Sequence, residues 1–93
     1  MVSPSMTRSL VRVRVVGEDG QPVPQALVTI VSSSVPVAEI ALVPDGSGLV
    51  SLQLPSGERF SLIANCFDRR IGSLLVSTPV DRDDILAIIV RAP

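Results

Sequence analysis

The chain contains no histidine, no lysine, no tyrosine and no tryptophan, and these absences narrow its function before any motif is considered. General acid–base catalysis would have to rest on carboxylates, and a serine or cysteine nucleophile would lack its usual base. A Ser–His–Asp triad cannot be assembled from this chain. We therefore expect a protein that is not an enzyme and that carries no cofactor.

Aromatic residues and cysteine are also scarce. Two phenylalanines offer few platforms for stacking bases, and the eight arginines are scattered apart from the Arg69–Arg70 pair, so we expect no binding of nucleic acid. The single cysteine, Cys66, cannot form an internal disulfide, and without histidine it is a poor zinc ligand. It is expected to be a buried, unreactive thiol on a strand.

No hydrophobic run is long, although 46% of the residues are hydrophobic and the mean hydropathy is +0.50. The longest run, 85–90, is far shorter than the roughly 18 residues that span a bilayer. The first nine residues lack the charged and apolar regions of a secretory signal, so a cytoplasmic location is the default, with leaderless export left open. The 93 residues suit one domain, expected over 10–93 behind a flexible arm at 1–9.

The clearest positive pattern lies in residues 45–64. Apolar and polar side chains alternate over 49–54 and again over 59–64, which predicts two strands because successive side chains of a strand point to opposite faces. Pro55 cannot donate a ladder hydrogen bond and Gly57 permits a tight reversal, so a short loop joins them. The stretch predicts one hairpin of an all-β domain.

Five further segments have a similar β-type pattern, and none has a convincing helical period. Turn residues recur about every ten positions, which is typical of a sandwich or barrel. The expected strands are 10–16, 26–31, 37–43, 49–54, 59–64, 71–77 and 85–91. The side chains expected in the core are Val13, Val15, Val28, Ile30, Leu52, Phe60, Leu62 and Ile88.

Residues 20–30 read GQPVPQALVTI, and residues 45–62 read DGSGLVSLQLPSGERFSL. The first stretch is similar to the pattern G-x-P-V-x-x-A-x-V-x-L and the second to D-x-x-G-x-F-x-L-x-L-P-x-G-x-Y-x-L. In these patterns the chain resembles carboxypeptidase regulatory-like domains, which belong to the transthyretin-like (prealbumin-like) β-sandwiches. Val50 and Phe60 depart from the larger or hydroxylated aromatics that are common there. The resemblance covers about 10–91 and implies a seven-stranded Greek-key sandwich. Strands two and five would pair, flanked by three and six.

Domains of this family mostly serve as accessory or interaction modules, and the histidines of its hydrolase branch are absent here. We therefore expect a non-catalytic protein–protein interaction or assembly module that docks to a larger protein or self-associates. A contiguous cluster of outward apolar side chains would form its interface. The candidates are Leu27, Val31, Ile63, Leu75, Ile85 and Ile89. The first four would share one sheet, and pairing through the edge of the last strand is an alternative.

A small-ligand or calcium-binding domain is the other function considered. Asp81, Asp83 and Asp84 place three carboxylates in one turn, and 45–47 form a second oxygen-rich loop of the kind that hard cations prefer. Neither loop has EF-hand spacing, and Arg82 interrupts the first. A solvated acidic turn before the last strand is the competing interpretation.

Overall fold

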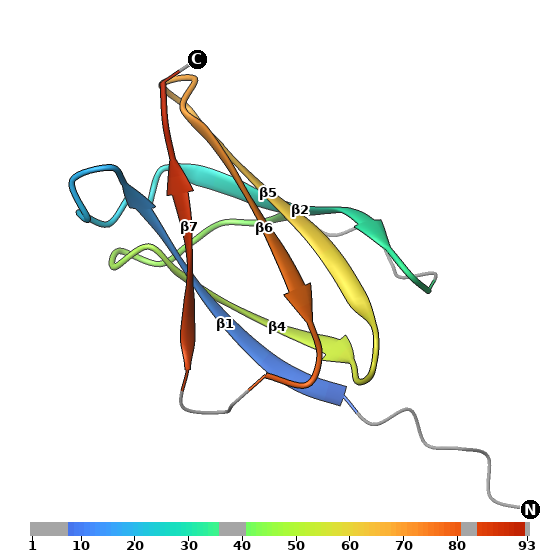
Figure 1. Cartoon of the computed structure of the whole chain (residues 1–93). Coiled ribbons are helices and arrows are strands. Elements are labelled where there is room, and N and C mark those ends of the chain that lie inside the picture. Colours follow the sequence, from blue (N-terminus) through green and yellow to red (C-terminus); the bar gives the residue numbers. More distant parts are fainter. Residues whose placement is uncertain (1–7, 36–40, 81–83, 93) are drawn as a thin grey trace, which may run out of the picture.

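The computed structural model describes residues 8–35, 41–80 and 84–92, which form strands and connecting turns (Figure 1). This part of the chain contains no helix long and apolar enough to cross a membrane. The strands are β1 (Arg8–Gly17), β2 (Ala26–Ser33), β3 (Ala41–Leu42), β4 (Leu49–Pro55), β5 (Arg59–Cys66), β6 (Ile71–Ser77) and β7 (Ile85–Val90).

The strands form two sheets whose inner faces share one core. In the three-stranded sheet the order is β4-β1-β7, with β1 antiparallel to β4 and parallel to β7. In the four-stranded sheet the order is β3-β2-β5-β6, and all neighbours are antiparallel. The predicted all-β sandwich is confirmed. The central pair β2–β5, flanked by β3 and β6, also has the order that the family resemblance implies.

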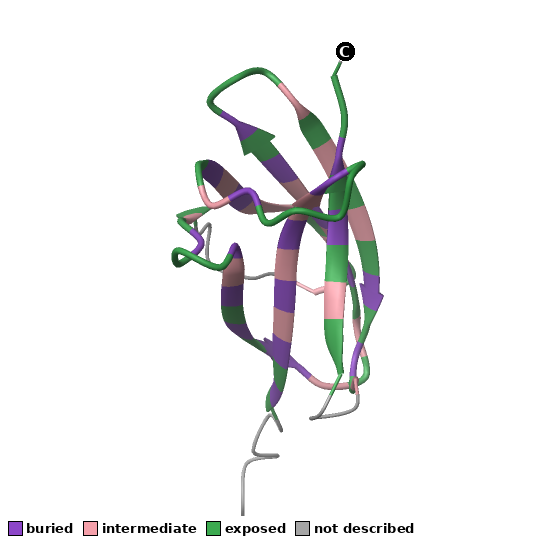
Figure 2. Cartoon of the chain, turned by 90° about the vertical axis from the view of Figure 1, so that its left-hand side faces the viewer, coloured by how far each residue is buried: buried purple, intermediate pink, exposed green. Residues whose placement is uncertain are grey.

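Buried and exposed residues alternate along the strands, because successive side chains point to opposite faces of a sheet (Figure 2). All predicted core side chains are buried except Ile30. The buried apolar core consists of Val11, Val13, Val15, Val23, Ala26, Val28, Val50, Leu52, Leu54, Phe60, Leu62, Ala64, Cys66, Val76, Ile88 and Val90.

A β-bulge accounts for the exception at Ile30. The register between β2 and β5 shifts between Ile30 and Ser32, so Val31 has no partner of its own on β5. An extra residue bends the strand locally. Ile30 therefore packs against the core from its margin and is only partly buried.

The N-terminal boundary differs from the prediction. Arg8 and Ser9, assigned to the flexible arm, belong to β1 and pair with β4. Ser9 is buried, and its hydroxyl lies 2.6 Å from that of Ser56. A polar side chain on the inner face breaks the apolar alternation, and for this reason the start of the strand was not recognised.

Other strands also differ in extent. β2 continues to Ser33 and β5 to Cys66, each two residues beyond its predicted end. The predicted strand 37–43 is represented by β3 alone, since residues 36–40 lie outside the described part of the chain.

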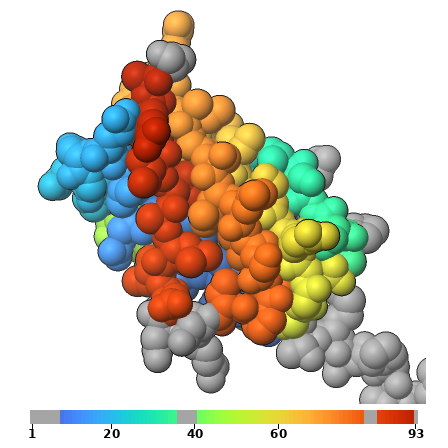
Figure 3. Space-filling model, viewed as in Figure 1, coloured from blue at the N-terminus to red at the C-terminus, as the bar shows by residue number. Residues whose placement is uncertain are grey.

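One side of the sandwich is closed where β6 meets β7. The backbones of Ile71 and Arg91 exchange two hydrogen bonds of 3.0 Å, although their strands belong to different sheets. The two strands lie side by side on the molecular surface (Figure 3). No comparable bridge joins β3 to β4 within the described ranges.

Candidate interaction surface

Among the described residues, the outer face of the β3-β2-β5-β6 sheet has no charged side chain across its centre, and Arg59 lies on the same side at the start of β5. Strand register places residues of four strands on it: Thr29 is opposite Ile63, and Ile63 is opposite Ser73. We call this surface the neutral face. It consists of Leu27, Thr29, Val31, Ala41, Ser61, Ile63, Asn65, Ile71, Ser73 and Leu75.

Four residues of the expected interface belong to the neutral face. Leu75 is 83% exposed and Val31 is 53% exposed, whereas Leu27 and Ile63 are half-buried between their neighbours. Because β2, β5 and β6 are adjacent, these four side chains lie on one surface. The apolar groups are separated by small hydroxyl and amide side chains.

The other two residues of the expected interface lie elsewhere. Ile85 and Ile89 are exposed on β7, on the outer face of the three-stranded sheet. Ile85 is opposite Arg12 and Ile89 is opposite Val16. The six residues named from the sequence therefore divide between two surfaces on opposite sides of the sandwich.

Four exposed apolar residues are not among the expected interface residues: Leu10, Val43, Phe67 and Ile71. Phe67, at 72% exposure, directly follows the last residue of β5. Ile71 has the same strand parity as Leu75, and this parity could have identified it. Val43 directly follows β3, where little of the predicted strand is described.

The hairpin tip that carries Phe67 is held by its own side chains. The Asp68 carboxylate accepts hydrogen bonds from the backbone N–H of Arg70 at 3.1 Å and from its Nε at 2.9 Å. These contacts lower the pKa of Asp68, the backbone hydrogen bond most of all. Arg69 has a φ of 76°, in the left-handed region that non-glycine residues rarely adopt. The tip is thus a defined turn that presents Phe67 to solvent.

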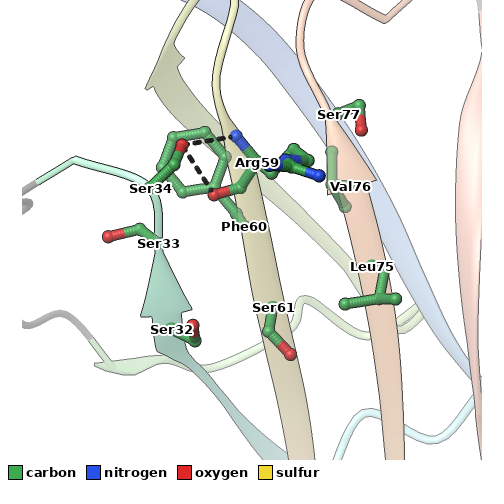
Figure 4. Close-up of a pocket in the computed structure, with 9 residues that line it drawn as sticks. All are labelled: Ser32, Ser33, Ser34, Arg59, Phe60, Ser61, Leu75, Val76 and Ser77. Atoms are coloured by element: carbon green, nitrogen blue, oxygen red, sulfur yellow. Dashed lines mark hydrogen bonds between the residues drawn. The ribbon is translucent and has the colours of Figure 1, made fainter.

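A shallow depression of about 380 Å³ lies at the bulged end of the neutral face (Figure 4). Its polar lining includes Arg59 and the hydroxyls of Ser32, Ser61 and Ser77, and the side chain of Leu75 forms an apolar part of the wall. Within the described residues the Arg59 guanidinium makes no hydrogen bond or ion pair. The chemistry of this lining suits an oxyanion such as a carboxylate.

The wall of this depression is fixed by Ser34. Its Oγ accepts a hydrogen bond from the backbone N–H of Arg59 at 2.9 Å (Figure 4). The same hydroxyl donates to the Glu58 carboxylate at 2.6 Å. Ser34 therefore tethers the end of β2 to the start of β5. Glu58 also brings a negative charge to this border.

The alternative interface is pairing through the edge of the last strand. The outer edge of β7 is occupied at its C-terminal end, because Arg91 pairs with Ile71 of β6. β4 is the other edge of the three-stranded sheet. There Arg8 Nη1 donates to the backbone oxygen of Gln53, at a long 3.4 Å. Within the described residues the rest of the outer edges of β4 and β7 pairs with no other strand, so edge pairing stays an alternative to the sheet faces.

The oxygen-rich loop at Asp45 is a structural turn. Asp45 Oδ1 accepts hydrogen bonds from the Ser47 N–H at 2.8 Å, the Ser47 hydroxyl at 2.6 Å and the Leu49 N–H at 3.1 Å. These bonds lower the pKa of Asp45, with the Ser47 hydroxyl the largest cause. Over the described ranges no three Cys, Asp or Glu side chains are grouped to hold a metal ion. Residues 81–83 of the acidic turn lie outside those ranges.

Cys66 is buried at the end of β5, as expected. Loss of hydration on burial raises the pKa of its thiol, and the nearby Asp68 carboxylate raises it further. Arg70 opposes this shift only weakly. The environment therefore favours the neutral thiol over the reactive thiolate.

No protein-family model matches the chain, and a search of curated proteins finds no significant match either.

Proposed function

We propose that the protein is a non-catalytic assembly module that self-associates through its neutral face. The observation that carries the proposal is the combination of exposed apolar side chains on adjacent strands with no charged side chain between them among the described residues. Leu75 and Val31 each expose more than half of their surface to water. Clustered apolar surface of this kind is typical of protein–protein contacts.

A second copy is the occupant that the charge pattern favours. Two neutral faces related by a two-fold axis meet without opposing like charges. The opposite sheet cannot pair with itself in this way, since its outer face carries Arg12 and Arg14. The hydroxyls of Thr29 and Ser61 can exchange hydrogen bonds between the apolar contacts. An ordinary interface buries about 800 Å² per partner, an area that one sheet face can supply.

The resemblance to carboxypeptidase regulatory-like domains supports the same proposal, because those domains mostly act as interaction modules. We include membership of that family in the proposal. The all-β sandwich and the strand order are compatible with it.

The test is the molar mass in solution, measured by size-exclusion chromatography with light scattering. Wild-type protein should elute at about twice the 9.8 kDa of one chain at high concentration. Ile63→Glu places a charge at the centre of the neutral face and should return the protein to monomer. Ile89→Glu places the same charge on the opposite sheet and should leave the mass unchanged. A monomeric wild type at high concentration would contradict self-association.

The depression at Arg59 supports one second candidate, a site for a small carboxylate ligand. The observation that favours it is the Arg59 guanidinium, which lies among several hydroxyls and has no hydrogen bond or ion pair with the part of the chain that the structure describes. A thermal-shift screen of small mono- and dicarboxylates should then raise the unfolding temperature of wild type and leave that of Arg59→Gln unchanged. Equal responses of both proteins would reject this site.

A further inference from the structure

The two outer sheet surfaces differ in charge. Within the described residues every carboxylate side chain lies in a turn or loop outside the strands: Glu18, Asp19, Asp45, Glu58, Asp68 and Asp84. β1, in contrast, places Arg8, Arg12 and Arg14 on the outer side of the three-stranded sheet, because Ser9, Val11 and Val13 between them point inward.

The strands beside these arginines are uncharged on the same side. Arg12 is opposite Ser51 on β4 and Ile85 on β7, and Arg14 is opposite Leu49 and Ala87. We call this surface the arginine face. It consists of Arg8, Leu10, Arg12, Arg14 and Val16 of β1, Leu49, Ser51 and Gln53 of β4, and Ile85, Ala87 and Ile89 of β7.

One carboxylate outside the face interacts with it. Arg14 helps to lower the pKa of Asp45, but as the smallest of the causes. Asp45 is held in its own turn by Ser47 and Leu49, so it gives Arg14 no direct hydrogen bond within the described ranges. The guanidinium of Arg14 therefore keeps most of its binding capacity.

The two central arginines are partly withdrawn from water. Arg12 and Arg14 are half-buried against the flanking strands. The Arg14 Nε atom is buried and lacks a hydrogen-bond acceptor among the described residues. An acidic group brought to this surface meets a positive charge that water screens less than on a fully exposed side chain, which strengthens charge-assisted hydrogen bonds.

We propose that the arginine face binds an extended acidic segment of a partner protein, with carboxylates at alternate positions. Arg12 and Arg14 are two residues apart on one strand, so their attachment points are separated by about 6.7 Å. Carboxylates at positions i and i+2 of an extended peptide have the same repeat. The aliphatic side chains of Leu10, Ile85 and Ile89 would contact apolar residues of that segment.

Other occupants fit less well. A second copy cannot use this face against itself, because arginines would oppose arginines. Nucleic acid would find no stacking platform, since Phe60 is buried and Phe67 lies at the hairpin tip, outside the face. A bilayer surface would attract the arginines, but its lipid headgroups have no fixed spacing that matches Arg12 and Arg14. The arginine face also has no tryptophan or tyrosine to anchor the protein in a membrane.

Fluorescence anisotropy with a labelled peptide tests the proposal. The probe is a short peptide in which glutamate alternates with valine and threonine; a peptide of identical composition with its glutamates in one block is the control. Wild type should bind the alternating peptide more tightly than the block peptide, and the affinity should fall as salt rises. Arg12→Gln/Arg14→Gln should weaken binding by about tenfold or more. Arg69→Gln/Arg70→Gln removes the same charge at the hairpin tip and should stay within about twofold.

Each contrary result overturns the proposal. These results are no binding of the alternating peptide, equal binding of the two peptides, and equal losses in the two double variants. Tighter binding to phosphatidylserine vesicles or to single-stranded DNA would assign the face to a membrane or to nucleic acid. Loss of self-association in Arg12→Gln/Arg14→Gln would assign it to a second copy. If that variant does not fold, Arg8→Gln/Arg14→Gln, which retains Arg12, must show the loss of affinity.

Discussion

Gly72 of β6 lies directly beneath the carbonyl oxygen of Ile89 in β7, so close that a β-carbon at position 72 would stand 2.2 Å from that oxygen. The contact joins the two sheets next to the backbone pair of Ile71 and Arg91. It exists because glycine has no side chain, which lets the two backbones approach. The closed side of the sandwich therefore depends on this residue.

Substitution of Gly72 by alanine should destabilise the fold by about 1–3 kcal/mol, because β7 must move to admit the methyl group. Urea unfolding followed by circular dichroism measures the change. Ser73→Ala, one residue along on the exposed side, should alter the free energy of unfolding by less than about 0.5 kcal/mol. Equal stability of Gly72→Ala and wild type would show that β6 and β7 do not approach so closely.

The two phenylalanines should differ sharply when truncated. Phe60 is 2% exposed in the core, and Phe60→Ala should cost about 3–5 kcal/mol of unfolding free energy. Phe67 is at the hairpin tip, and Phe67→Ala should cost less than about 0.5 kcal/mol. The same unfolding experiment measures both changes. A loss below about 1 kcal/mol for Phe60→Ala would mean that its ring is not in the core.

Cys66 should resist thiol reagents in the folded protein. Burial shields the sulfur and raises the pKa of the thiol. At about pH 8.5, where an exposed cysteine is half ionised, little of Cys66 is therefore in the thiolate form. Ellman's reagent should therefore react many times more slowly in native buffer than in denaturant. Rapid modification of the native protein would instead point to an accessible, reactive thiol.

Acid should destabilise the protein partly through Asp45. Its folded-state pKa is lowered, so the stabilisation is present above the ordinary aspartate value of about 3.9 and is lost as the pH falls through the lower folded-state value. Asp68 has a shift of the same sign. Asp45→Asn should show a smaller fall in the unfolding midpoint between neutral and acidic pH than wild type. An unchanged pH dependence would contradict the role of the turn.

The alternation of side chains explains how much of the fold was predictable. Valines at every second position of β1 show which face is buried, and the same parity at Leu62 and Ile88 assigns them to the core. Contacts between distant segments leave no such pattern. Nothing near Gly72 in the sequence indicates that Ile89 will lie above it. Ser9 was missed for a different reason. Its hydroxyl is buried on the inner face, and a search for apolar residues at inward positions does not find a serine.

The candidate surface was predictable in part for the same reason. The alternation of side chains along each strand correctly predicts that Leu27, Ile63 and Leu75 point away from the core. It does not say which outward residues share a surface. That depends on the sheet to which each strand belongs, and it separates Ile89 from the others. The exposed position of Phe67 depends on a turn held by side-chain contacts.

The most direct test of the neutral face as the interface is a methyl NMR dilution series on isoleucine-, leucine- and valine-labelled protein. One sample reports on both sides of the sandwich, since Ile63 and Leu75 lie on the neutral face and Ile85 and Ile89 lie on the arginine face. We predict that the methyl signals of Ile63 and Leu75 shift or broaden from micromolar to millimolar concentration, while those of Ile85 and Ile89 stay constant. Changes confined to Ile85 and Ile89, or no change at any of the four methyl-bearing residues, would contradict the account.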